Sequence, residues 1–122
     1  MREIITAALL LAILLAGVAV NNRIMLDFCS TATEMIGALP AADDRRCVAA
    51  VEDLARLWEA RRTAVSFSVS YDDIERISEK LALLTAAAEL GDTVEFEARR
   101  AELASAVGHA ARLERLGFES IF

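Results

Sequence analysis

Residues 4–20 read IITAALLLAILLAGVAV, a run without a charged side chain in which Thr6 alone is polar. A helix rises about 1.5 Å per residue, so the run covers roughly 25 Å of a hydrocarbon core about 30 Å thick. Arg2 and Arg23 flank the run, and their long side chains can extend outward to the lipid headgroups. The run therefore predicts a transmembrane anchor over residues 1–22, which contacts the bilayer through residues 4–20.

Two other interpretations of this run stay open at the level of sequence. Gly17 and Ala19 place small residues where a signal peptidase would require them for a cut after Ala19. The run is longer than the apolar core of most signal peptides, however, and a retained anchor is the preferred interpretation. The third possibility is a buried helix of a soluble protein. The slight positive bias at Arg2 favours a cytoplasmic N-terminus and an extracytoplasmic C-terminal domain.

The remainder of the chain has the composition of one small helical domain. It is long enough for a single hydrophobic core, and it is rich in the helix formers Ala, Leu, Glu and Arg. The formal net charge of −6 belongs entirely to this part, because Arg2 and Glu3 cancel. Phosphate backbones repel such an acidic domain, so nucleic acid is not an expected partner.

Apolar side chains recur at helical spacing and predict helices over residues 23–37, 43–66, 71–90 and 93–116. The first of these helices can continue the membrane helix into water. The expected inward stripes are Ile24, Phe28, Ala32, Met35 and Ile36; Cys47, Val51, Leu54, Trp58 and Val65; Ile74, Ile77, Leu81, Leu84 and Ala88; and Phe96, Leu103, Val107, Ala110 and Leu113.

Turn residues mark the expected ends of the first two helices. Gly37 and Pro40 end the first helix, and the pair Asp43-Asp44 supplies acidic groups suited to the N-terminus of the second. Residues 66–70 alternate in polarity, but they are too few and too isolated for a strand. We interpret them as a helix end and a connector.

The last two helices have clearer boundaries. Residues 70–73 resemble an N-terminal cap, and Asp92-Thr93-Val94-Glu95 has the form of a capping box that follows the turn residue Gly91. A junction of about two residues makes these helices antiparallel. The tail 117–122 contains three apolar residues, and we expect it to dock on the bundle.

A weak internal repeat relates the two halves of this domain. Asp43 aligns with Asp92, and Cys47 aligns with Phe96. The repeat indicates two stacked helical hairpins, although coincidence in a chain of such biased composition explains it as well. The predicted fold is all-α: one N-terminal transmembrane helix, followed over residues 23–122 by an antiparallel bundle of three to four helices in two hairpins.

No residue pattern in the chain points to catalysis, a cofactor or a metal. His109 is the one histidine, and its spacing from Cys29 and Cys47 matches no structural zinc site. Phosphate-binding glycine loops and hydrolase motifs are absent from the sequence. The pair Asp72-Asp73 lacks the spacing of a calcium loop. We therefore expect a protein that is not an enzyme and has no catalytic, cofactor-binding or metal-binding residues.

The remaining candidate residues have structural interpretations. Cys29 and Cys47 can pair in an extracytoplasmic domain, but their stagger along an antiparallel hairpin favours two reduced, buried thiols. Trp58 is expected to anchor the core. The arginine pairs 45–46, 61–62 and 99–100 are expected to form ordinary ion pairs with nearby Glu residues.

Several segments resemble a known bacterial family. They are RLWEARR at residues 56–62, DDIE at 72–75, the Gly91-Asp92 turn and the ending ESIF at 119–122. Together with the leading anchor they are similar to the small membrane-anchored proteins called domain of unknown function 4363, over nearly the full length. The chain has Ala and Arg where that family has Lys and Glu. The resemblance implies an anchored helical domain in the bacterial membrane, and it supplies no activity and no catalytic residues.

These observations predict an interaction or scaffold module that tethers or supports a partner protein at the membrane, where the partner can be a second copy of the chain. The alternative is an extracytoplasmic module that senses a small molecule held between its helices. A void of about 300 Å³ or more in the bundle interior, lined by polar groups, would favour sensing. A dry core with an apolar stripe left outside would favour interaction.

Overall fold

The structure is a computed structural model that describes residues 1–65 and 71–121, with side chains described up to Gly117. It contains four helices: α1 (Arg2–Gly37), α2 (Cys47–Val65), α3 (Tyr71–Leu90) and α4 (Thr93–Ile121). The described residues contain no strand, so the all-α prediction is confirmed. The expected connector at 66–70 lies outside the described residues.

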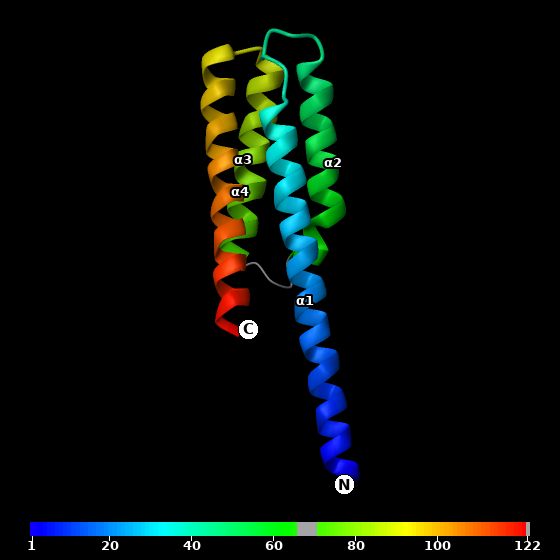
Figure 1. The fold of residues 1–122 in the computed structure, drawn as a ribbon. Helices are drawn as coiled ribbons and strands as arrows, with labels where there is room; N and C mark the ends of the chain where they lie inside the picture. Colours follow the sequence, from blue (N-terminus) through cyan, green and yellow to red (C-terminus); the bar gives the residue numbers. More distant parts are fainter. Residues whose placement is uncertain (66–70, 122) are drawn as a thin grey trace.

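The helices run up, down, up and down around a closed ring (Figure 1). Helix α1 packs against α2 and α4, and α3 packs against the same two helices. Two hairpins, α1–α2 and α3–α4, therefore lie side by side, as the internal repeat predicts. The N-terminal half of α1 projects beyond the bundle, on the side where α4 ends (Figure 1).

The core follows the predicted stripes of α2 and α3 throughout. All five expected inward residues of each helix are buried. Trp58 is buried in the core, as predicted. The centroid of its indole lies 5.4 Å from that of the Phe28 ring, and its Nε1 donates a hydrogen bond of 2.9 Å to Ser78 Oγ. This bond satisfies the one polar group of the indole, so the ring is buried without an unpaired donor.

Of the residues expected in the core, Ile24 and Leu113 lie outside it, and Met35 packs against its edge. Ile24 is exposed and Met35 is half-buried, while Met25 takes the inward position near the start of the bundle. Leu113 of α4 is 46% exposed. The spacing identified the right helices, but Ile24 stays exposed because Ala60 and Ala64 of α2 are too short to cover it.

Helix α2 begins at Cys47 rather than at Asp43. The carboxylate of Asp44 accepts the backbone N–H of Arg46 at 2.8 Å, which holds residues before Cys47 in a turn. The guanidinium of Arg46 also hydrogen-bonds this carboxylate and lowers the pKa of Asp44 to about 2. The acidic pair therefore forms the turn before the helix instead of its first turn.

Asp92 both ends α3 and begins α4. Gly91 has φ +67°, and the N–H of Asp92 donates to the carbonyl of Ala87 at 3.3 Å, which closes the C-terminus of α3. The Asp92 carboxylate then accepts the N–H of Glu95 at 3.1 Å. Since the Asp92 N–H is already bound to Ala87, the Glu95 carboxylate pairs with Arg99 instead, and half of the predicted capping box forms.

Replacing Asp92 by alanine is expected to lower the free energy of unfolding by about 1 kcal/mol, because Glu95 loses its N-terminal cap. The matched control is Asp43→Ala, which removes an exposed carboxylate from the corresponding turn of the first hairpin. Thermal unfolding of both variants checks the prediction. Equal melting temperatures for Asp92→Ala and the parent would show that the cap contributes nothing.

Helix α4 continues to Ile121 and does not end at 116 as expected. Gly117 is flanked on both sides by helical residues, because an isolated glycine costs a helix only about 1 kcal/mol. Residues 117–121 thus belong to the helix, and their expected docking through apolar side chains falls largely outside the described residues.

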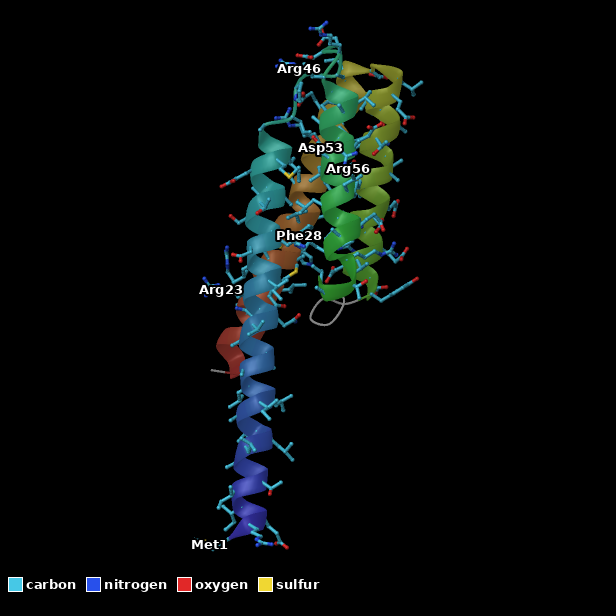
Figure 2. All side chains as sticks on the ribbon, turned by 90° about the vertical axis from the view of Figure 1, so that its right-hand side faces the viewer. Met1, Arg23, Phe28, Arg46, Asp53 and Arg56 are labelled. Carbon is cyan, nitrogen blue, oxygen red and sulfur yellow. The ribbon has the colours of Figure 1, made fainter. Side chains whose placement is uncertain are left out.

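Helix α1 is unbroken from the apolar run into the bundle. Arg2–Gly37 is the one described helix that is long and apolar enough to cross a membrane, and its most apolar window is not buried in the bundle. Residues 1–14 are all exposed, and Figure 2 shows this end of α1, near Met1, extending away from the bundle. A buried helix of a soluble protein does not fit this arrangement, because the bundle leaves the run uncovered.

Candidate functional site

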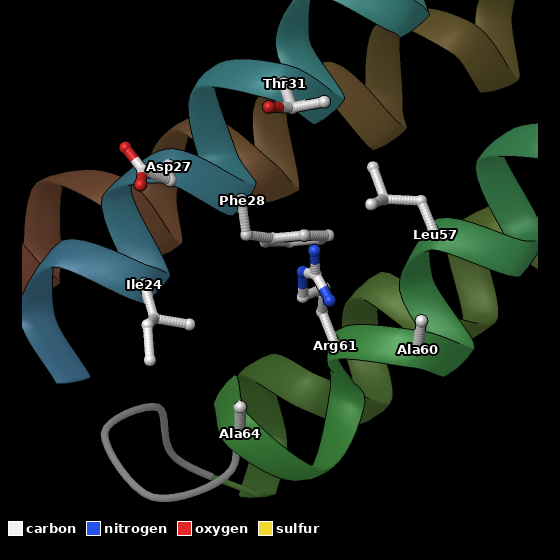
Figure 3. Close-up of a pocket in the computed structure, with 8 residues that line it drawn as sticks. All are labelled: Ile24, Asp27, Phe28, Thr31, Leu57, Ala60, Arg61 and Ala64. Atoms are coloured by element: carbon white, nitrogen blue, oxygen red, sulfur yellow. The ribbon is translucent and has the colours of Figure 1, made fainter. Parts of the chain in front are cut away.

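A groove lies between α1 and α2 near the end of the bundle from which the apolar run projects (Figure 3). It has a volume of about 350 Å³ and is open to solvent. Its lining residues are Ile24, Asp27, Phe28, Thr31, Leu57, Ala60, Arg61 and Ala64. The groove forms because the short side chains of Ala60 and Ala64 leave space opposite α1.

The groove has an apolar floor and a charged rim. The ring of Phe28 lines its floor, and Leu57 points into it from α2 (Figure 3). The guanidinium of Arg61 extends toward the Phe28 ring, while Asp27 lies on α1 at the edge (Figure 3). A surface of this kind can bind an apolar side chain and orient it through charge.

A second hollow of about 460 Å³ continues the groove along α1. It shares Ile24 and Ala64 with the first and adds Ala16, Gly17, Val20 and Asn21. Its lining is almost wholly apolar, and three of its residues belong to the run 4–20. The two hollows therefore form one groove, which we call the α1/α2 groove, from the apolar run into the bundle.

A third hollow, of about 360 Å³, lies between α3 and α4. It is shallow, and most of the residues that line it have charged or polar side chains: Arg76, Lys80, Glu102, Ser105, Ala106, His109 and Arg112. Glu102 is held by Arg99 at 3.0 Å and by Lys80 at 3.4 Å, and the hydrogen bond from Arg99 lowers the pKa of Glu102. The carboxylate thus stays ionised and serves to tie α3 to α4.

That the chain has no catalytic, cofactor-binding or metal-binding residue stays a prediction. In the part of the chain that the structure describes, no three His, Cys, Asp or Glu side chains are grouped to hold a metal ion. His109 lies beside cations at the third hollow. The predicted ion pairs with Glu residues form at Arg62, with Glu59 and Glu75, and at Arg99, with Glu95, whereas Arg46 pairs with Asp44.

Both cysteines are buried and unpaired as thiols. Burial raises the pKa of Cys29 from its ordinary value of 9.0 to about 11, and it raises the pKa of Cys47 as well. Cys29 lies outside the apolar run. The pair therefore behaves as the two reduced, packed thiols that the stagger of the hairpin predicts.

Labelling of the native chain at pH 8 by a thiol reagent should be slow. The rise in pKa of Cys29 alone lowers the thiolate fraction about a hundredfold relative to the unfolded chain, and burial restricts access further. An introduced Val94→Cys, at an exposed position, is the reactive control. Two rapidly labelled native thiols, or no thiol until a reductant is added, would contradict this prediction.

Sequence reasoning did not identify the α1/α2 groove. Arg61 was assigned to surface ion pairing, and Ile24 was assigned to the core. The sequence does contain one signal, the i, i+4 pair of small residues Ala60 and Ala64 on α2, which leaves room for a neighbour. In an alanine-rich chain this signal does not stand out.

Comparisons with known proteins add no relative. No family model, no curated protein and no solved structure matches this chain.

Proposed function

We propose that this protein is a non-catalytic, single-pass membrane-anchored interaction module, which docks an apolar helix of a partner membrane protein in the α1/α2 groove. The observation that supports this proposal is that the hollow beside the apolar run of α1 and the hollow beside the bundle share the lining residues Ile24 and Ala64. Small residues such as Gly17 and Ala64 let a neighbouring helix approach closely. Arg61 and Asp27 then supply polar contacts outside the bilayer.

The proposal places the protein in a bacterial cell membrane with the acidic bundle on the extracytoplasmic side. The resemblance to the family called domain of unknown function 4363 supports the bacterial membrane, and the charge bias around the run supports the orientation. The partner is a second copy of the chain or another membrane protein. Tethering of that partner is the role that such a module performs.

The alternative is a small-molecule sensor. The first hollow has a volume in the range of ligand sites, but ligand sites bury most of the ligand, whereas both hollows are open along their length. The described core is apolar apart from Asn22. An apolar core beside an open groove supports docking of a helix over enclosure of a small molecule.

Photo-crosslinking of the full chain in its native membrane tests the proposal. A crosslinking residue at Val20 or Ala60 should capture the same single protein, whereas a probe at Val94, at the other end of the bundle, should not. Ala64→Leu, which fills the groove, should abolish capture, and Ala49→Leu on an exposed face of the same helix should leave it unchanged. Capture that persists in Ala64→Leu would refute docking in the groove.

A further inference from the structure

The contacts of Arg100 show which residues of α4 lie beside which residues of α1. Its guanidinium donates hydrogen bonds to the carbonyl oxygens of Gly37 at 2.8 Å and Leu39 at 3.2 Å. The two helices are antiparallel neighbours, and both rise about 1.5 Å per residue. Each step along α4 past Arg100 therefore corresponds to one step back along α1. Leu116 lies level with about residues 22–24 of α1, within roughly one turn of the end of the apolar run.

The C-terminal end of α4 extends past its neighbour α3. Helix α4 has 29 residues and α3 has 20, and the two are joined by the tight turn at Gly91. The last nine residues of α4, 113–121, consequently run past the start of α3, beside α1 (Figure 1). We call this segment the overhang. It explains why Leu113 and Leu116 are 46% and 60% exposed although they continue the helix that supplies the core.

One face of the apolar run of α1 is partly covered by the bundle. Leu15 and Val18 are partly buried, whereas the other residues of 4–20 are exposed. They share the helix face of Asn22 and Met25, which are buried against the bundle. The face of α1 that packs on the bundle thus extends into the apolar run. The overhang lies at the boundary between the run and the bundle.

The charges differ between the two ends of the bundle. The overhang and the residue just before it carry both signs: the exposed Arg112 and Arg115 flank the leucines, Glu114 and Glu119 lie in the same segment, and Arg23 of α1 is at a similar level. At the opposite end, Leu90 and Val94 are each 82% exposed. Their neighbours in sequence are acidic: Glu89, Asp92, Glu95 and Glu97. What distinguishes the overhang is its position beside the end of the apolar run, where Leu113 and Leu116 can reach lipid and the guanidinium groups of Arg112 and Arg115 can bind lipid phosphates.

We propose that the overhang of α4 is a second membrane contact of this protein, lying in the headgroup layer of the phospholipid bilayer beside α1. Leu113 and Leu116 contact lipid, and Arg112 and Arg115 meet the phosphates. Because α1 is continuous, the overhang is held at this depth and no separate binding step is required. Such contacts are typical of amphipathic helices at interfaces. The inference rests on the proposed function, since α1 must be the anchor.

Fluorescence depth measurements on the full chain test the proposal. In a background where Cys29 and Cys47 are alanine, single cysteines replace Leu116, Val94 or Leu11 and carry an environment-sensitive nitrobenzoxadiazole label. Vesicles of phosphatidylcholine and phosphatidylglycerol contain a quencher either near the headgroup or near the end of the acyl chain. Circular dichroism of each variant checks that the helices form.

The label at residue 116 should emit at shorter wavelength than the label at 94, and the headgroup quencher should quench it most strongly. The label at residue 11 should respond most to the deep quencher. If 11 is quenched and 116 behaves like 94, the second contact is refuted while the anchor stands. If 11 is also unquenched, the anchor itself fails. A blue-shifted but unquenched label at 116, reversed by dilution with unlabelled lipid, would mean that a second copy covers the overhang and would overturn the proposal.

Discussion

Replacing Leu81 by aspartate is expected to unfold the bundle. Leu81 lies at the centre of the α3 stripe and is 6% exposed. A carboxylate there loses its hydration without gaining a partner, and the leucine packing is lost as well, for a combined cost of about 4 kcal/mol or more. Domains of this size have a free energy of unfolding of about 5–15 kcal/mol. Circular dichroism and thermal unfolding of the full chain in detergent should show loss of the cooperative transition.

Leu90→Asp is the matched control for this prediction. It makes the same substitution in the same helix, at a position that is 82% exposed. Its melting temperature should stay close to that of the parent, since a surface substitution usually changes stability by about 0.5 kcal/mol or less. Similar unfolding of both variants would mean that charge on α3, rather than burial at Leu81, determines the outcome.

Replacing both Leu11 and Leu14 by arginine is expected to release the protein from the membrane. The two leucines lie near the middle of the apolar run and are exposed in the structure. Each arginine at the centre of a span opposes insertion by about 3 kcal/mol, so the pair costs roughly 6 kcal/mol. The fraction of the chain that resists carbonate extraction should fall sharply, while the bundle, whose core lies outside residues 4–20, should keep its circular dichroism.

The control for the span is Leu90→Arg with Val94→Arg, which adds two arginines at exposed positions at the other end of the bundle. This variant should remain in the membrane fraction. The intact mass of the extracted parent separates a retained anchor from a cleaved signal peptide, because cleavage after Ala19 removes the run. A parent chain extracted by carbonate, or a double-arginine variant that stays embedded, would contradict the anchor.

The helices of the bundle and one of its turns could be predicted from the sequence. The spacing of Ile74, Ile77, Leu81 and Leu84 predicts one buried face of one helix, and the structure buries all four. Gly91 and Asp92 predict a tight antiparallel turn, which the positive φ of Gly91 and the cap on Glu95 confirm. These predictions succeed because they depend on interactions within a few residues of each other.

The errors occur where two distant helices meet. Ile24 has the spacing of a core residue, but it borders the α1/α2 groove because Ala60 and Ala64 of α2 are too short to cover it. Leu113 also has the spacing of a core residue. It lies beyond the first residue of α3, Tyr71, so α3 does not cover it. The sequence pattern of one helix does not tell how long the neighbouring helix is, or how far the side chains of that helix extend.

The sequence by itself determined that the chain has an uncharged span of residues 4–20, that amphipathic helices follow it, and that tight turns join them. These properties arise from composition, from periodicity and from short-range hydrogen bonds. Only the tertiary structure decided that one unbroken α1 carries both the span and a face of the bundle, that a groove opens beside it, and that α4 extends past α3. Those features depend on the relative lengths and packing of helices far apart in the chain, and packing is settled when the helices meet.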